Sequence, residues 1–275
     1  MHVDKIHLTK EKATYLATLY GKAMDTAAEH PILGDRWAAD AVARIDYNVE
    51  GLNLPRGHEI TLPLRAAHFD RWTRAFLAAN PASTVLHLGC GLDTRVYRID
   101  PGPRVRWFDV DFPDVIALRE QLYPARAGYR MIGSSVTDLA WLDAIVGDTP
   151  VIVVGEGLVM YLHEQEGTAL FRRITTQFPR GEIVFDGYSR AMVRLVSRLA
   201  TVRGAKVELV WGVGDPRDLE LQVPGLRLVE SASFLTMPEL VHRLARTWTS
   251  AAMYAVMSLL PFYRNLVRHV RYVFP

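Results

Sequence analysis

The sequence predicts an α/β fold in which helices cover both faces of a doubly wound, mostly parallel sheet. From residue 84 onward, short runs rich in Val, Ile and Leu alternate with amphipathic stretches of helical length, a pattern typical of repeated β-α-β units. A purely helical pattern precedes them. We therefore expect a helical N-terminal cap in residues 1–80 and a core in residues 81–275, since 275 residues are enough for one large domain with such an addition.

The expected elements follow in order along the chain. The cap contains three helical stretches separated by turn-forming residues: 10–29, 36–45 and 64–79. The core contains seven short apolar runs that we expect to be strands: 85–88, 105–109, 129–132, 151–154, 182–186, 206–210 and 226–233. Helices are expected between most of these strands, at 115–121, 139–145, 164–177 and 192–202. Ligands of such sheets bind beyond the carboxyl ends of the strands, so the residues that follow each strand are candidates for a site.

The composition is that of an ordinary globular enzyme, with 49% hydrophobic and 23% charged residues. A formal net charge of +2 gives no electrostatic argument for nucleic-acid binding. The single cysteine, Cys90, excludes an internal disulfide, and the first residues lack the apolar run of a signal peptide. We therefore expect a cytoplasmic location.

The first expected strand runs into a turn that contains Gly89, Cys90 and Gly91. Glycines at this place let the backbone approach a bound nucleoside closely, because no Cβ intervenes. A dinucleotide-binding turn needs a third glycine where this chain has Thr94. The adjacent Asp93 would repel a pyrophosphate but suits a cationic ligand. These features favour S-adenosylmethionine (SAM), which carries a sulfonium and an ammonium and no phosphate, over NAD or FAD.

The second strand ends in Asp109 and Asp111, about 20 residues after the turn, where a carboxylate can accept both ribose hydroxyls. We expect the two side chains to point to opposite faces of the strand, so that only one of them can do this. We prefer Asp111, which is nearer the following loop; the alternative is that one carboxylate caps the next helix. Because the neighbouring residues supply no further ligands, we expect no metal site.

Two more strand ends carry polar residues. After the third strand, Asp138 and Leu139 could contact the amino group and the ring of an adenine, while the alternative is that Thr137 or Asp138 caps the next helix. After the fourth strand, Glu156 stands between two glycines and is a candidate for orienting the methyl donor or a substrate hydroxyl. The following His163 lacks the second histidine of a zinc helix, so zinc is rejected.

Upstream of the first strand, Arg65 lies on an expected helix. Its guanidinium could hold a carboxylate through two parallel hydrogen bonds. The alternative is a surface arginine whose stem is partly packed.

Together these segments resemble the leucine carboxyl methyltransferase-like family of SAM-dependent O-methyltransferases, and within it the tetracenomycin-type polyketide branch. The matching segments span roughly residues 60–240: Arg65 with Asp70, 88–95, 108–113, Asp138 with Leu139, 155–162 and 211–216. The resemblance implies a class I methyltransferase fold, which is Rossmann-like with seven strands, one of them added antiparallel by a final hairpin.

The resemblance also implies a role for each site residue. By it, Arg65 binds the SAM carboxylate, Gly89 lies under the cofactor and Asp111 binds the ribose. Asp138 and Leu139 would lie at the adenine, with Glu156 beside the methyl donor. His87 departs from the family, which usually has an apolar residue or Glu there.

The expected function is methyl transfer from SAM to a carboxylate or hydroxyl of a small, largely apolar acceptor of polyketide or lipid type. A carboxylate needs no base, whereas a hydroxyl would profit from one. His68, His163 and His242 are candidates, although each is more typical of a surface or packed histidine. Tyr161 could position the acceptor; a core tyrosine is the alternative.

Two other classes of protein remain as alternatives, a nicotinamide-dependent reductase and a non-catalytic SAM-binding protein at a membrane. The second is suggested by residues 247–263, which are mostly apolar and are followed by arginines. This run is shorter than the roughly 20 residues of a spanning helix. We favour a buried helix or pocket wall here over an interfacial helix, so membrane contact through residues 247–275 is not the preferred interpretation.

Overall fold

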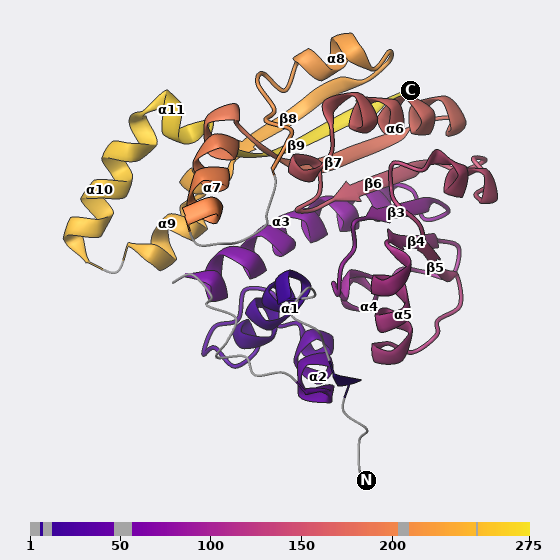
Figure 1. The fold of residues 1–275 in the computed structure, drawn as a ribbon, viewed down its shortest axis with the longest axis horizontal. Coiled ribbons are helices and arrows are strands. Elements are labelled where there is room, and N and C mark those ends of the chain that lie inside the picture. The colour runs from indigo at the N-terminus through magenta and orange to yellow at the C-terminus, as the bar shows by residue number, and fades with distance from the viewer. Residues whose placement is uncertain (1–5, 8–12, 47–56, 203–208, 246) are drawn as a thin grey trace.

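The computed structural model describes residues 6–7, 13–46, 57–202, 209–245 and 247–275. Its centre is a seven-stranded sheet in the order β5-β4-β3-β6-β7-β9-β8 (Figure 1). The strands are β3 (Thr84–Leu88), β4 (Arg106–Asp111), β5 (Tyr129–Gly133), β6 (Val151–Gly155), β7 (Gly181–Tyr188), β8 (Arg227–Ser233) and β9 (Val267–Phe274). The first five in this order pair in parallel, and β9 is antiparallel to both of its neighbours. The predicted fold class is confirmed.

Helices pack on both faces of this sheet because its central strands are apolar on both sides. Leu86 and Val153 belong to a core cluster that includes residues of α6 (Glu164–Gln177) and α8 (Asp218–Gln222). Their neighbours Val85 and Ile152 belong to a second cluster on the opposite face. That cluster includes residues of five helices: α1 (Ala13–Asp25), α2 (Arg36–Arg44), α3 (His58–Ala79), α4 (Arg95–Ile99) and α5 (Pro113–Leu122).

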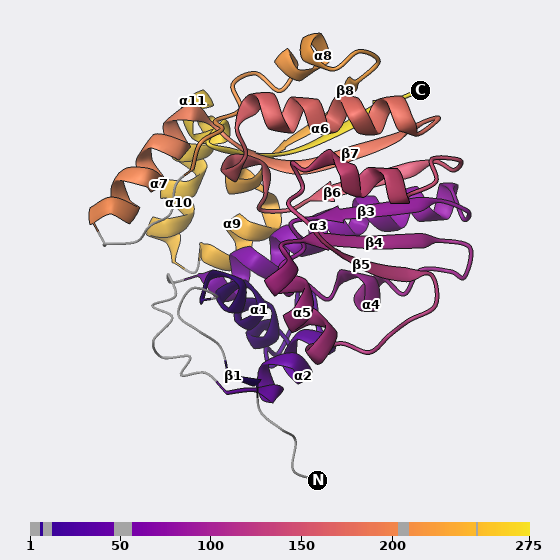
Figure 2. The same ribbon diagram turned by 45° about the vertical axis from the view of Figure 1, so that its right-hand side comes forward.

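The N-terminal helices α1, α2 (Arg36–Arg44) and α3 pack beside the carboxyl end of the sheet (Figures 1 and 2). Asp35 caps α2 by accepting a hydrogen bond from the Ala38 amide. The short strands β1 (Ile6–His7) and β2 (Ile45–Asp46) form a separate parallel pair. Helix α3 begins at His58, earlier than predicted, and contains Pro63. The helix continues through the proline because burial of this turn offsets the backbone hydrogen bond that proline cannot donate.

Three expectations about single elements need correction. The strand β9 was missed, because its alternating Val, His and Arg residues read as a basic tail. The strand predicted at 206–210 lies mostly outside the described residues, and positions 209–210 are loop. Residues Leu139–Ala144 form the 3-10 helix η3 rather than an α-helix. The sheet has seven strands, as expected, and β9 is one of them.

The chain between β8 and β9 forms α9 (Pro238–Leu244), α10 (Trp248–Leu259) and α11 (Pro261–Arg264) at one end of the molecule (Figure 1). No residue of α10 or α11 is buried. The expectation that residues 247–263 are a buried helix or a pocket wall is therefore wrong. Within the described part of the chain, no helix is long and apolar enough to span a membrane.

Candidate active site

A cavity of about 730 Å³ lies at the carboxyl edge of the sheet, within the size range of small-molecule sites. Its walls come from the ends of β3, β4 and β6 and from the helices α1, α3 and α7 (Arg190–Val202). Of the predicted site residues, six line it: Arg65, Gly89, Cys90, Gly91, Asp111 and Glu156. Tyr161 lines it as well. Most of the predicted residues therefore lie together at the carboxyl ends of the strands, where ligands of such sheets bind.

The glycine turn after β3 forms the floor of this cavity. Gly89 and Gly91 have φ values of 58° and 50°, in the left-handed region that favours glycine. A Cβ on Gly89 would lie 2.9 Å from Leu158 Cδ1, so the turn has no room for a side chain there. Cys90, between them, is buried, and burial raises the pKa of its thiol.

Asp111 ties the turn to the end of β4. Its Oδ2 accepts a hydrogen bond from the Gly91 amide at 2.7 Å, and its Oδ1 accepts one from the Phe112 amide at 2.8 Å. Burial raises the pKa of this carboxyl, although both amides act in the opposite direction. The carboxylate is thereby fixed at the cavity wall.

Asp109, two residues before Asp111, lies on the same face of β4 and not, as expected, on the opposite one, because strand side chains repeat with a period of two; it lies deeper along the strand and is fully buried. It forms an ion pair with Arg119 and accepts hydrogen bonds from His87 at 3.0 Å and Tyr129 at 2.7 Å. Burial alone would raise the pKa of Asp109, but Arg119 and His87 outweigh it and lower the pKa to about 2. Asp109 thus belongs to the interior and not to the cavity.

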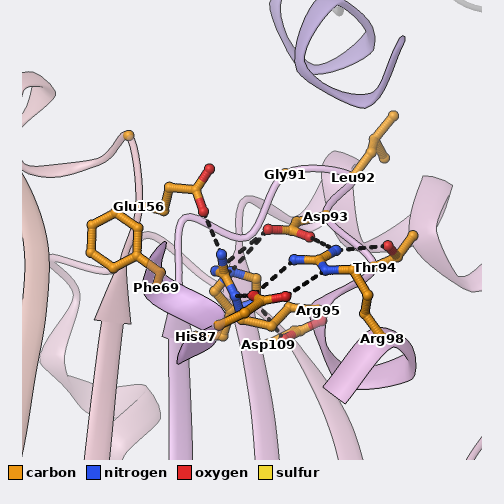
Figure 3. Close-up of polar contacts among 12 residues, drawn as sticks. Phe69, His87, Gly91, Leu92, Asp93, Thr94, Arg95, Arg98, Asp109 and Glu156 are labelled. Carbon is orange, nitrogen blue, oxygen red and sulfur yellow. Dashed lines mark hydrogen bonds and ion pairs between the residues drawn. The ribbon is translucent and has the colours of Figure 1, made fainter. Parts of the chain in front are cut away.

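Glu156, at the end of β6, is surrounded by three cations. Arg65 Nε lies 3.0 Å and Lys22 Nζ 3.5 Å from its Oε1, and Arg95 bonds its Oε2 (Figure 3). Burial alone would raise the pKa of Glu156, but Lys22, Arg95 and Arg65 hold it well below the ordinary value. The side chain is therefore a carboxylate at all physiological pH values.

Charged residues behind the turn extend this network to the cap (Figure 3). Arg95 donates to Asp70 at 2.7 Å, and Arg98 donates to Asp70 and Asp93 at 2.7 Å each. Arg98 also bonds Asp35 at 2.8 Å. Since Asp35 caps α2 and Asp70 lies on α3, the network fixes both cap helices to the glycine turn.

Arg65 reaches two carboxylates from α3. Besides Glu156, its Nη1 lies 3.4 Å from Asp186 Oδ2 on β7. Asp186 Oδ1 in turn accepts a hydrogen bond from the Gly157 amide at 2.5 Å. The Arg65 side chain keeps 15% exposure and lines the cavity, so part of its guanidinium can meet a ligand.

The predicted adenine contacts are not among the cavity-lining residues. Asp138 is the N-cap of η3, accepting a hydrogen bond from the Ala140 amide at 3.3 Å, which matches the alternative interpretation. Leu139 packs against the hydrophobic core. The preceding residues 134–137 line the cavity instead.

None of the three candidate histidine bases lines the cavity. His163 and His242 are exposed, and His68 is buried against His269. His87 does line the cavity, but Asp109 and Arg95 contact its two ring nitrogens at 3.0 Å each.

Sequence reasoning missed the contribution of α1. Lys22 is 3% exposed and contacts both Asp93, at 2.9 Å, and Glu156. Tyr15, which lies about two helical turns before Lys22 on α1, also lines the cavity. A lysine on a mostly apolar helix gave no motif that could have singled it out.

The arrangement fits SAM better than a metal or a dinucleotide. No cluster of three or more metal-binding side chains occurs among the described residues. The glycine floor leaves space for a nucleoside, Asp111 places a carboxylate at the cavity wall, and Arg65 and Lys22 beside Glu156 place positive charge where a ligand carboxylate could bind.

Comparisons with known proteins agree with this site. The family model for leucine carboxyl methyltransferase matches residues 13–175. The tetracenomycin polyketide synthesis O-methyltransferase TcmP of Streptomyces glaucescens is 40% identical over 272 residues, covering 98% of this chain and 99% of TcmP. The S-adenosyl-L-methionine-dependent methyltransferase dpfgK of Gibberella zeae is 35% identical over 247 residues, covering 82% of this chain and 83% of dpfgK.

Solved structures are similar in fold at low sequence identity. A protein from Thermobifida fusca YX gives a TM-score of 0.57 at 16% identity, covering 92% of this chain and 94% of that one. A DUF574 family protein from Streptomyces avermitilis gives a TM-score of 0.56 at 17% identity, covering 92% of this chain and 100% of that one. The alternative of a nicotinamide-dependent reductase is wrong, since the relatives are methyltransferases. The chain belongs to the leucine carboxyl methyltransferase family and is a SAM-dependent O-methyltransferase.

Proposed function

We propose that this enzyme methylates a carboxylate on a small, largely apolar acceptor of polyketide type. The observation that carries the choice of a carboxylate is that the described residues lining the cavity include no free histidine and no carboxylate without a hydrogen-bond partner; even the exposed Glu166 accepts a hydrogen bond from the His163 amide at 3.2 Å. The polyketide class is supported by the similarity to TcmP, an O-methyltransferase of tetracenomycin polyketide synthesis. A hydroxyl acceptor is the alternative that the experiment below distinguishes.

The cofactor end of the cavity is the glycine turn with its surrounding charges. We assign Gly89, Cys90 and Gly91 to the floor under SAM, and Asp111 to the ribose hydroxyls. Arg65 would hold the amino-acid carboxylate. Lys22, which sequence reasoning did not single out, would share that end with Glu156, beside the methyl donor. When bound, SAM supplies an electrophilic methyl group on its sulfonium.

The adenine end lies among residues 134–137, which line the cavity beyond Asp111. Val136 offers an apolar contact for the ring. Asp138 and Leu139 come next along the chain, and Asp138 caps η3. We keep them as proposed adenine contacts on the condition that η3 moves toward the cavity when the cofactor binds.

The acceptor end is the apolar part of the cavity. Its side chains come from α3, from the segment after β6, and from α7 with the loop that follows it: Leu62, Met160, Leu162, Val196 and Leu209. Tyr161 and Tyr188 are the phenols on this side. An acceptor that fills this end buries apolar surface, which contributes about 25 cal/mol per Å².

The lining residues hold their protons or their charges too tightly to serve as a base. Burial raises the pKa of Tyr15 and of Tyr188 to about 12, so neither is a phenolate at neutral pH. Glu156 is occupied by three cations, and His87 is hydrogen-bonded at both nitrogens. An acceptor carboxylate is already ionised, so this site needs only to align it with the methyl group.

The test is a transfer assay with SAM labelled in its methyl group and two matched aromatic acceptors, one with a carboxyl group and one with a phenol only. We expect label in the product of the carboxylic acid. Alkali should release this label as volatile methanol, because an ester hydrolyses whereas an aryl ether does not. Label that resists alkali, or transfer to the phenol alone, would overturn the proposed carboxylate acceptor.

A further inference from the structure

The apolar helix α10 packs chiefly against α9, α11 and η5 (Phe234–Thr236), and none of its residues is buried. Trp248 is 83% exposed and Leu259 80%, with Val256 at 61%. The following α11 adds Phe262 at 67%. In Figure 1 the two helices lie at an outer edge of the molecule. A helix that is apolar around its whole circumference is normally buried in protein or lipid, so something outside the described chain covers this one.

The charges around this edge are positive. After Glu239 the sequence contains no acidic residue. Of the arginines among the described residues of this segment, Arg243 pairs with Glu239 and Arg271 with Glu182, which leaves Arg264 and Arg268. Arg264, which ends α11, is exposed. Helix α7, at the same end of the molecule, adds the exposed Arg194 and Arg198 on either side of Leu195, which is 49% exposed. This combination suits a surface that is both apolar and anionic.

We propose that α10 and α11 dock on an anionic lipid surface, with α10 lying in the headgroup region. Twelve residues span about 18 Å, too short for the roughly 30 Å hydrocarbon core, so the helix lies in the surface and does not cross it. Trp248 and Tyr254 are the residue types enriched at that boundary. The arginines add attraction to acidic headgroups.

A second copy of this chain is the other occupant considered. A two-fold interface would bring the same arginine-rich segments together on both subunits, with no carboxylate after Glu239 to pair with them. The charge therefore favours lipid. The proposal does not depend on which acceptor the enzyme methylates.

The experiment is co-sedimentation of the full chain with vesicles of phosphatidylcholine alone and of phosphatidylcholine with phosphatidylglycerol. We expect binding to the anionic vesicles, weaker binding to the neutral ones, and a loss of that difference at about 1 M salt, where the Debye length is about 3 Å. The double variant Val256→Glu/Leu259→Glu should lose at least about tenfold in affinity for the anionic vesicles, because two apolar side chains are replaced by negative charges, which acidic headgroups repel.

The matched control is Leu221→Glu, a leucine on α8 that is 87% exposed and lies away from α10 (Figure 1). It should bind vesicles as the wild type does. All variants should bind S-adenosylhomocysteine normally, which shows that they are folded. Two results would overturn the proposal: equal sedimentation of the double variant and the wild type, or a stable dimer in sedimentation velocity that the double variant dissociates and that binds no vesicles.

Discussion

Arg65 on α3 and Glu156 at the end of β6 meet at 3.0 Å across 91 residues of sequence. The contact joins a helix of the N-terminal part to the carboxyl edge of the sheet, beside the glycine turn. Lys22 on α1 approaches the same carboxylate at 3.5 Å. The candidate cofactor site is therefore built jointly by the N-terminal helices and the sheet, and neither part contains it alone.

The first prediction concerns the shape of the Arg65 side chain. Arg65→Lys keeps the positive charge but loses the planar fork that bonds Glu156 and a ligand carboxylate together. Hydrogen bonds to charged groups contribute about 1.5–3 kcal/mol, so the dissociation constant for S-adenosylhomocysteine should rise about 10- to 100-fold in calorimetry. Arg173→Lys, at a surface ion pair with Asp143, is the matched control and should leave it unchanged. Normal affinity in the Arg65 variant would remove the residue from the cofactor site.

The second prediction separates the two aspartates of β4. Asp111→Asn should weaken S-adenosylhomocysteine binding about tenfold or more, because its carboxylate lines the cavity, and should lower the melting temperature less than Asp109→Asn, although it loses one acceptor of the Gly91 and Phe112 amides. Asp109→Asn should do the reverse, since it leaves the fully buried Arg119 without its charge partner, which costs about 3–5 kcal/mol. Calorimetry and thermal unfolding of both variants check this. Equal effects of the two on binding would contradict the assignment.

The sequence predicted the parallel strands closely because each is a short apolar run bounded by turn residues. The site residues at the strand ends followed from topology, since Asp111 and Glu156 are far apart in sequence but share one sheet edge. The expectation that the two aspartates of β4 point to opposite faces was wrong, because side chains two residues apart share a face; what separates them is depth along the strand, with Asp111 at the cavity and Asp109 in the interior.

Other features depend on tertiary contacts that no local pattern reveals. The strand β9 contains His269 and Arg271, which read as polar, but His269 is fully buried against His68, and Arg271 pairs with Glu182 across the sheet. Lys22 looks like a surface residue of an ordinary helix. The exposure of α10 was mispredicted because apolar composition normally indicates burial, whereas the described part of the chain buries none of its residues.

The third prediction concerns the buried pair His68 and His269, whose Nδ1 atoms lie 2.8 Å apart. One ring must donate and the other accept, so both cannot be protonated. Burial, helped by Arg71, lowers the pKa of His68 from 6.5 to about 4, and burial with His68 and Arg65 lowers the pKa of His269 further. The unfolded chain therefore binds more protons than the folded one below pH 6.5. The stability that the neutral histidine pair contributes above that pH is lost as the pH falls toward 4.

Urea unfolding across this window checks the histidine pair. The free energy of unfolding should decrease as the pH falls from 6.5 to about 4, and the double variant His68→Leu/His269→Leu should show a smaller slope. His163→Leu, at an exposed position, should keep the wild-type slope. If the double variant kept it too, the acid sensitivity would have to come from other groups.

The fourth prediction concerns Tyr161, which follows β6 and lines the cavity while keeping 46% exposure. Its hydroxyl makes no hydrogen bond within the part of the chain that the structure describes, and burial raises its pKa, so it is a neutral donor available to an acceptor oxygen. Tyr161→Phe removes one such bond, worth about 0.5–1.5 kcal/mol, and should lower kcat/KM for the acceptor about two- to tenfold. The affinity for S-adenosylhomocysteine should not change, because the residue lies on the acceptor side. Tyr254→Phe on α10, outside the cavity lining, is the matched control and should leave both quantities as in the wild type. A Tyr161 variant with unaltered kcat/KM would show that the phenol does not position the acceptor, and the apolar wall alone would then have to align its carboxylate.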